Sequence, residues 1–224
     1  MIIVGDIQHG VVVKNLPHID SYLVWIYGKE LFATLPRFHA LKDYKVQEQL
    51  FAAVMEIKGA RITLSQKIPQ FTKAMFYLYL GDFLKEHSFE VRRAVVVPPT
   101  AVANNSSSVK SSYGIGKVLI ECKNGYMGFK QLTDLFRPVL SKLPDIYKNI
   151  RFYFIPHVED PVELVKECLQ PAPKDKIISV QTFGDRNLTV LVPAANLGGY
   201  IGKDGLNLKT AARLAGCNIT IEGI

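Results

Sequence analysis

The sequence predicts an α+β protein, in which a small closed β-barrel precedes a helix and two copies of a mixed unit of strands and helices. Three observations predict this class. Short strand-like segments separated by turn signals fill residues 1–67, and helical spacing of apolar residues begins at residue 68. The order strand, strand, Gly-x-x-Gly, helix, strand then occurs twice. The expected divisions are 1–67, 68–87, 88–155 and 156–224.

The composition indicates a globular protein with an anionic partner. Lys and Arg number 27 against 20 Asp and Glu, which gives a net charge of +7. Such an excess favours nucleic acid or an anionic membrane surface. The apolar stretch at 74–84 is too short to cross a bilayer, and residues 1–7 do not form a signal peptide. Three widely spaced cysteines indicate neither zinc nor a disulfide framework, so we expect a cytoplasmic protein without cofactor or metal.

Five short strands are expected in the first division, at 10–13, 21–26, 31–35, 49–57 and 60–64. A small barrel of the oligonucleotide-binding (OB) type accommodates them, since closure removes exposed strand edges. Aromatic and basic residues alternate here, as is typical of surfaces that stack bases. The candidate RNA contacts are Tyr22, Trp25, Phe32, Arg37 and His39. Alternation along 22–27 defines two faces, and the pattern leaves open which one is core.

A helix is expected over 68–86, with Pro69 in its first turn, as a connector to the first mixed unit. That unit has expected strands at 89–97, 117–122 and 150–155, and a helix over 129–143. A segment rich in Ser, Asn and Pro at 98–113 is predicted to be a hairpin loop. The second unit has expected helices over 161–169 and 206–215, and expected strands at 177–182, 188–192 and 218–221, with Asp160 as an N-cap.

The second Gly-x-x-Gly segment, 202–205, carries the strongest functional signal. Gly202 and Gly205 flank the start of a helix, so a phosphate backbone can approach the main chain and the positive end of the helix dipole. Lys203 adds a charge beside Asp204. This is the logic of a KH domain, whose loop clamps the backbone of about four nucleotides. Neighbouring candidate contacts on the helix are Asn207, Lys209 and Arg213.

The first Gly-x-x-Gly segment is less specific, because its middle residues, Tyr126 and Met127, carry no positive charge. Two readings stay open: RNA contact through stacking on Tyr126, or a structural turn. The candidate residues are Gly125, Tyr126, Met127, Gly128 and Lys130. The two units together predict tandem KH domains of type II.

Three stretches resemble the RNA-binding core of the NusA family of transcription factors. GARITLSQKIPQFTKAMFYLYL (59–80) looks like the end of a ribosomal-protein-S1-type barrel running into its helix, and VEDPVELVKECLQPA (158–172) looks like the start of a second KH domain. LVPAANLGGYIGKDGLNLKTAARLAGCNITI (191–221) is the most specific match. The resemblance implies single-stranded RNA as ligand, roles in pausing, termination and antitermination, and RNA polymerase or other transcription factors as partners. We expect no counterpart of the family's polymerase-docking domain ahead of the barrel.

Other classes are weighed against this reading. The five histidines lack metal-ligand spacing, and no GxSxG or phosphate-binding loop of the GxxxxGK type occurs, so we expect no enzyme. A barrel followed by KH also resembles cap subunits of the RNA exosome, which have one KH domain. An RNA-binding subunit of a degradation or translation complex, or a protein-interaction adaptor with degenerate KH domains, therefore remain alternatives. The sequence shows no basic amphipathic helix of the kind that binds a membrane surface.

Overall fold

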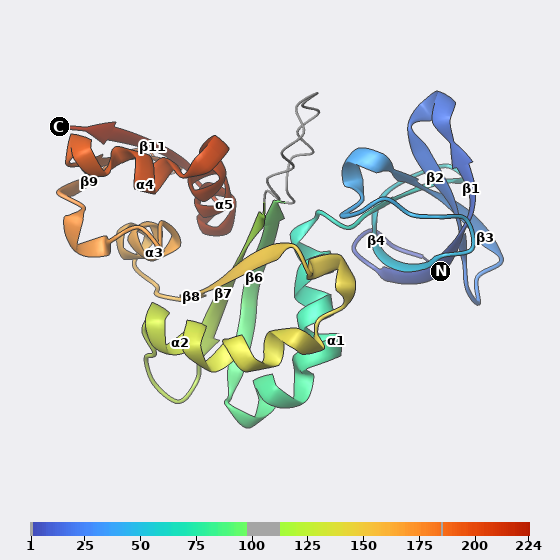
Figure 1. Ribbon diagram of the computed structural model, residues 1–224, viewed down its shortest axis with the longest axis horizontal. Coiled ribbons are helices and arrows are strands. Elements are labelled where there is room, and N and C mark those ends of the chain that lie inside the picture. Colours follow the sequence, from blue (N-terminus) through green and yellow to red (C-terminus); the bar gives the residue numbers. More distant parts are fainter. Residues whose placement is uncertain (1, 98–112, 185) are drawn as a thin grey trace, which may run out of the picture.

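The computed structural model describes residues 2–97, 113–184 and 186–224. Figure 1 shows the barrel at one end of the molecule, a first three-stranded sheet in the middle and a second one at the other end. The predicted loop at 98–113 lies, apart from its last residue, outside the described residues. A closed barrel joined to separate helices and small sheets confirms the α+β class.

The N-terminal barrel closes in the strand order β1-β2-β3-β5-β4. Its strands are β1 (Ile7–Leu16), β2 (Ser21–Ile26), β3 (Leu31–Pro36), β4 (Gln49–Lys58) and β5 (Arg61–Ser65). The described neighbours are antiparallel except β3 and β5, which pair in parallel at Thr34 and Thr63. All five expected strands are confirmed, although β1 starts earlier, at Ile7.

The structure decides which face of β2 is core. Tyr22, Val24 and Ile26 are fully buried inside the barrel. Trp25 is partly exposed on the opposite face, because successive side chains of a strand point to opposite sides. The outer face of β2 is therefore the one available to a ligand.

The first mixed unit consists of a three-stranded sheet with two α-helices. Its elements are α1 (Pro69–Glu86), β6 (Phe89–Val97), β7 (Gly114–Cys122), α2 (Phe129–Phe136) and β8 (Ile150–Pro156). The central strand β7 is antiparallel to β6 and parallel to β8. Helix α1 starts at Pro69, one residue later than predicted, and its buried Phe71, Phe76 and Leu84 belong to the core of this sheet.

The helix predicted over 129–143 is shorter than expected. Helix α2 ends at Phe136, and a 3-10 helix continues over Arg137–Lys142. Pro138 explains the change, because proline lacks an N–H and its ring clashes with the carbonyl four residues earlier.

The second mixed unit repeats the sheet arrangement of the first. Its elements are α3 (Pro161–Cys168), β9 (Ser179–Phe183), β10 (Asn187–Val192), α4 (Leu197–Ile201), α5 (Leu206–Ala215) and β11 (Asn218–Gly223). The central β10 is antiparallel to β9 and parallel to β11. Asp160 caps α3 as predicted, since its carboxylate accepts the N–H of Glu163 at 2.7 Å.

The short helix α4 was not predicted. Its sequence, LGGYI, contains Gly198 and Gly199, which have low helix propensity. Packing decides the conformation instead, because Tyr200 is fully buried in the core of the second unit.

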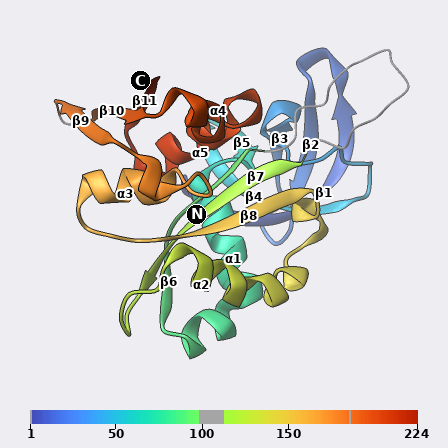
Figure 2. The same ribbon diagram turned by 60° about the vertical axis from the view of Figure 1, so that its left-hand side comes forward.

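The first sheet is buried on both faces. Val118 and Phe154 belong to the core formed with α1 and α2. Val95, Leu119 and Ile155 point the other way, into the core formed with α3 and α5. Figure 2 shows α5 beside β7, in agreement with the contacts of α5 with β6 and β7. The two units thus share an apolar core and are packed together.

Candidate nucleic-acid interface

The loop 202–205 joins α4 to α5 through a turn with left-handed backbone. The angle φ is 72° at Gly202, 56° at Asp204 and 70° at Gly205. Glycine adopts such angles without steric cost, and aspartate tolerates them better than most residues. Lys203 and Asp204 are exposed. The turn therefore presents bare main chain and an ammonium group at the start of α5.

The two glycines of this loop have different surroundings. A Cβ added at Gly202 would lie 2.7 Å from the Cβ of Asn207 and 3.0 Å from its backbone nitrogen. A Cβ at Gly205 would lie 3.5 Å from Cε of Lys209, which is an ordinary contact. Gly202 is therefore required for close packing, whereas Gly205 is favoured mainly by its backbone angles.

The start of α5 concentrates positive potential. Gly205 at the N-cap has no side-chain oxygen to accept the first N–H groups of the helix. Lys209 folds back, so that its Nζ donates to the carbonyl oxygen of Asp204 at 3.0 Å. Arg213 is exposed one turn further along. Such an arrangement suits a phosphate group, which accepts from the N–H groups and is attracted by the charge of Lys209.

Asn207 does not fit the predicted role of an RNA contact. Its side chain is buried, and its Nδ2 donates to the carbonyl oxygens of Leu169 at 2.9 Å and Tyr200 at 3.0 Å. Its Oδ1 accepts from Nζ of Lys117 at 2.6 Å. Because every polar atom of the amide is engaged inside the protein, the structure gives Asn207 a structural role under the loop.

Tyr22 is likewise inside the barrel and not a base-stacking platform. Its hydroxyl donates to Asp43 at 3.0 Å and accepts from Nη1 of Arg37 at 2.8 Å, and burial raises its pKa. Arg37 lies over the Tyr22 ring, 4.5 Å from its centroid. Its guanidinium pairs with Asp20 at 3.4 Å and Asp43 at 2.9 Å. Two carboxylates therefore reduce the charge that Arg37 offers to a phosphate.

Trp25 and Phe32 form an aromatic pair on the outer face of the barrel. They are cross-strand partners of β2 and β3, with ring centroids 4.8 Å apart in an edge-on arrangement. Phe32 is 52 % exposed. His39 lies in the 3-10 helix Arg37–His39, with Nδ1 3.1 Å from Oγ of Ser65, and burial followed by the charge of Lys67 lowers its pKa. The outer face thus keeps two of the predicted stacking residues.

The first Gly-x-x-Gly loop differs from the second in geometry. It follows β7 directly and precedes α2, whereas the second loop lies between two helices. Gly125 has a φ of 118°, but Gly128 has −75°, and the N–H of Gly128 donates to Oε1 of Gln131 at 3.0 Å. Met127 packs against the core of the first unit, and Lys130 is exposed.

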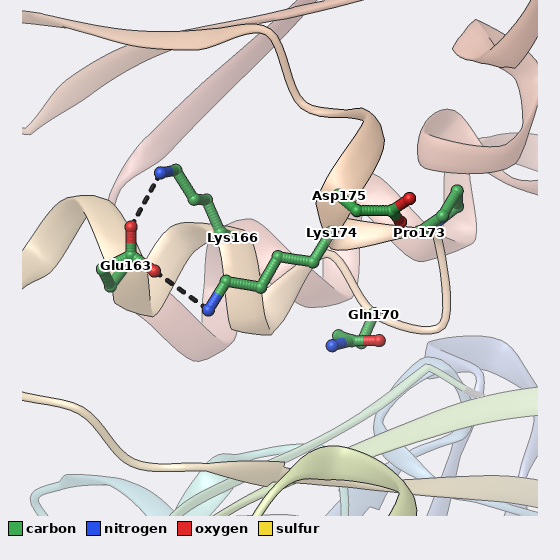
Figure 3. Close-up of a pocket in the computed structure, with 6 residues that line it drawn as sticks. All are labelled: Glu163, Lys166, Gln170, Pro173, Lys174 and Asp175. Carbon is green, nitrogen blue, oxygen red and sulfur yellow. Dashed lines mark hydrogen bonds and ion pairs between the residues drawn. The ribbon is translucent and has the colours of Figure 1, made fainter.

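Tyr126 connects this first loop to a charged cluster on the second unit. Its hydroxyl donates to Glu167 at 3.3 Å. Lys174 pairs with Glu167 at 2.6 Å and with Glu163 at 2.9 Å, and Lys166 pairs with Glu163 at 2.7 Å. Figure 3 shows both lysines reaching Glu163 at the pocket beside α3. Burial alone would lower the pKa of Lys174, but these hydrogen bonds raise it overall. The two glutamates therefore balance the positive charges of Lys166 and Lys174.

Two basic residues of the first sheet, which sequence reasoning missed, reach α5. Lys117 of β7 is fully buried, and burial lowers its pKa to about 7. Arg93 of β6 donates from Nη1 to the carbonyl oxygens of Arg213 at 3.2 Å and Leu214 at 3.1 Å. The only local signal was a lysine inside an apolar strand, and its partners are 51 and 90 residues away in sequence.

Among the described residues, no three His, Cys, Asp or Glu side chains are grouped so that they could hold a metal ion. Within the same ranges, no helix has the length and apolar character needed to cross a membrane.

A closed barrel, followed by a unit in which a Gly-x-x-Gly turn opens an amphipathic helix on a small sheet, defines a barrel-plus-KH protein. Residues 161–224 match the family described as the NusA-like second KH domain. The chain is also 30 % identical over 171 residues to the transcription termination/antitermination protein NusA of Mycobacterium bovis and of Mycobacterium tuberculosis. The chain therefore contains a NusA-like core.

The match covers 74 % of this chain and 44 % of each mycobacterial relative, so less than half of the relatives' length is represented. A solved structure titled "Crystal structure of APE1850" is similar at 20 % identity with a TM-score of 0.36, over 65 % of this chain and 96 % of that one.

Proposed function

We propose that the chain is a cytoplasmic factor that binds single-stranded RNA and, like NusA, modulates transcription elongation, pausing, termination or antitermination. The observation that carries this proposal is the loop 202–205, where bare glycine main chain, Lys203 and the start of α5 converge. RNA polymerase or other transcription factors are the proposed protein partners.

The chemistry of the loop favours a nucleic-acid backbone as ligand. A phosphate at the loop would accept N–H groups from the first turn of α5 and meet the charges of Lys203 and Lys209. Trp25 and Phe32 on the barrel would stack with bases of the RNA. This stacking does not depend on the sequence, because every base has a π-face. Backbone clamping at one end and stacking at the other suit an extended single strand.

The repeated sheet arrangement supports a pair of KH domains of type II, at 88–155 and 156–224, behind an OB-type barrel at 1–67 and the helix in 68–87. In both units the central strand is antiparallel to one neighbour and parallel to the other. Two such units favour the NusA-like assignment over an exosome cap subunit with one KH domain. The names of the mycobacterial relatives support termination and antitermination as the process.

The test is equilibrium binding of a short unstructured RNA to the native chain, Lys203→Glu and Lys142→Glu at several salt concentrations. Lys142 is an exposed lysine of the 3-10 helix in the first unit, so its variant has the same charge change at a different place. If Lys203→Glu loses one phosphate contact, the negative slope of log K against log salt should become shallower by about 0.7, because fewer counterions are released on binding.

We expect Lys203→Glu to bind at least about tenfold more weakly than the native chain, and Lys142→Glu to bind nearly as well. Equal affinities for folded Lys203→Glu and native protein would reject the loop as an RNA clamp. That result would favour the alternative that the chain is a protein-interaction adaptor.

A further inference from the structure

Lys117 is a buried amine whose hydrogen-bond partners all come from the other unit. It extends from β7 of the first sheet, and its Nζ donates to Oδ1 of Asn207 at 2.6 Å and, at the long distance of 3.4 Å, to the carbonyl oxygen of the same residue. The carbonyl oxygen of Cys168 at the end of α3 is a further acceptor. Burying an amine is costly unless its hydrogen bonds are made. The lysine is therefore a specific polar link beside the apolar part of the interface around Val95 and Leu119.

Asn207 transmits that link to the Gly-x-x-Gly loop. Its Nδ2 donates to the carbonyl oxygens of Leu169, just after α3, and Tyr200, near the end of α4. Its Cβ and backbone nitrogen lie against the space where Gly202 has no side chain. With Lys117 donating to Oδ1, the amide can only point Nδ2 toward the two carbonyl groups. One side chain thus fixes α4, the loop and the start of α5 relative to each other.

We propose that Lys117 is a positioning residue through which the first unit holds the 202–205 loop in its RNA-binding geometry. The second unit then clamps RNA at full strength only while Lys117 of the first unit holds the side chain of Asn207. The inference rests on the proposed RNA-binding function of the loop. Its physical reason is that a binding site loses affinity when its supporting hydrogen bonds leave the contacting groups loosely placed.

Arg93 provides a matched control at the same interface. It also reaches α5 from the first sheet, but it contacts the carbonyl groups of Arg213 and Leu214 at the far end of the helix from the loop. Removing its guanidinium takes away two hydrogen bonds between the units but leaves the contacts of Asn207 in place. Comparison of the two sites therefore separates loop positioning from interface strength.

The experiment measures the dissociation constant of a short unstructured RNA for Lys117→Met, Asn207→Ala, their double variant, Arg93→Met and Lys203→Glu. Methionine is close to lysine in shape and avoids burying an amine, so we expect Lys117→Met to stay folded in urea unfolding. We expect it to bind RNA about threefold to thirtyfold more weakly, the usual range for an indirect coupling. Arg93→Met should bind within about twofold of native.

A double-mutant cycle and hydrogen exchange separate positioning from general destabilisation. If Lys117 acts through Asn207, the double variant should bind like Asn207→Ala alone, whereas independent effects would multiply. Amides at 202–209 should exchange faster in Lys117→Met but not in Arg93→Met.

The outcomes distinguish this inference from the proposed function. Native affinity and native exchange in Lys117→Met, while Lys203→Glu binds weakly, would overturn the inference alone. Undiminished binding by Lys203→Glu would overturn the proposed function, whatever Lys117→Met shows. Faster exchange of the loop amides in Lys117→Met holds as evidence even if Asn207→Ala does not fold.

Discussion

Replacement of the two loop glycines by alanine should have unequal costs, although both have positive φ. Gly202 combines φ 72° with ψ 169°, a region that is nearly restricted to glycine, and occupying it costs an alanine about 1–3 kcal/mol. Its new Cβ would also lie 2.7 Å from the Cβ of Asn207, which adds about 1–3 kcal/mol of overpacking. Alanine also lowers the entropy of the unfolded chain, which restores about 0.4–1 kcal/mol, so the expected net loss for Gly202→Ala is roughly 3 kcal/mol.

Gly205→Ala should be far milder. With φ 70° and ψ 14°, alanine is left-handed at a cost of about 1–2 kcal/mol, and the new Cβ makes only ordinary contact with Lys209. Alanine also lowers the conformational entropy of the unfolded chain, which restores about 0.4–1 kcal/mol of stability. The net expected loss is roughly 1 kcal/mol. Gly128 is the N-cap of α2 with φ −75°, where alanine is a poorer cap by about 0.5–1 kcal/mol, and the lower entropy of the unfolded chain restores about 0.4–1 kcal/mol, so Gly128→Ala should change stability by only a few tenths of a kcal/mol.

The assay is urea unfolding of the native chain and the three alanine variants in one buffer, with the free energy of unfolding taken from the midpoint and the slope. The order of destabilisation should be Gly202→Ala, then Gly205→Ala, then Gly128→Ala. Equal losses for Gly202→Ala and Gly205→Ala would refute the close packing of Asn207 against Gly202. The same result would weaken the route from Lys117 to the loop.

Two further predictions concern the buried lysine and the barrel. Burial lowers the pKa of Lys117 to about 7, so between pH 7 and its ordinary 10.5 the unfolded chain holds a proton that the folded chain lacks, and stability rises with pH. From pH 7.5 to 8.5 the native chain should gain about 1 kcal/mol relative to Lys117→Met in urea unfolding; parallel curves would contradict a neutral buried amine. Trp25→Ala should weaken RNA binding by about 1–3 kcal/mol with a nearly unchanged salt slope, measured by titration. An affinity unchanged by Trp25→Ala would remove the outer face of β2 from the RNA path.

Local patterns in the sequence were sufficient for most elements, because they depend on short-range physics. Short strand-like segments between turn signals predicted the barrel strands, and the change to helical spacing with Pro69 predicted α1. Asp160 as an N-cap marks the start of α3, because caps satisfy helix ends from neighbouring residues. The 202–205 loop was recognisable for the same reason.

Tertiary structure decided what depends on residues distant in sequence. Alternation alone could not tell that Tyr22 faces the core, because both faces of β2 carry aromatic residues, and barrel closure made the choice. Asn207 looked like a surface contact until Lys117, 90 residues earlier, was seen to hold its amide. Composition and spacing predict local conformation, whereas the burial of a side chain depends on how the whole chain folds. Burial therefore decided which candidate residues can reach a ligand.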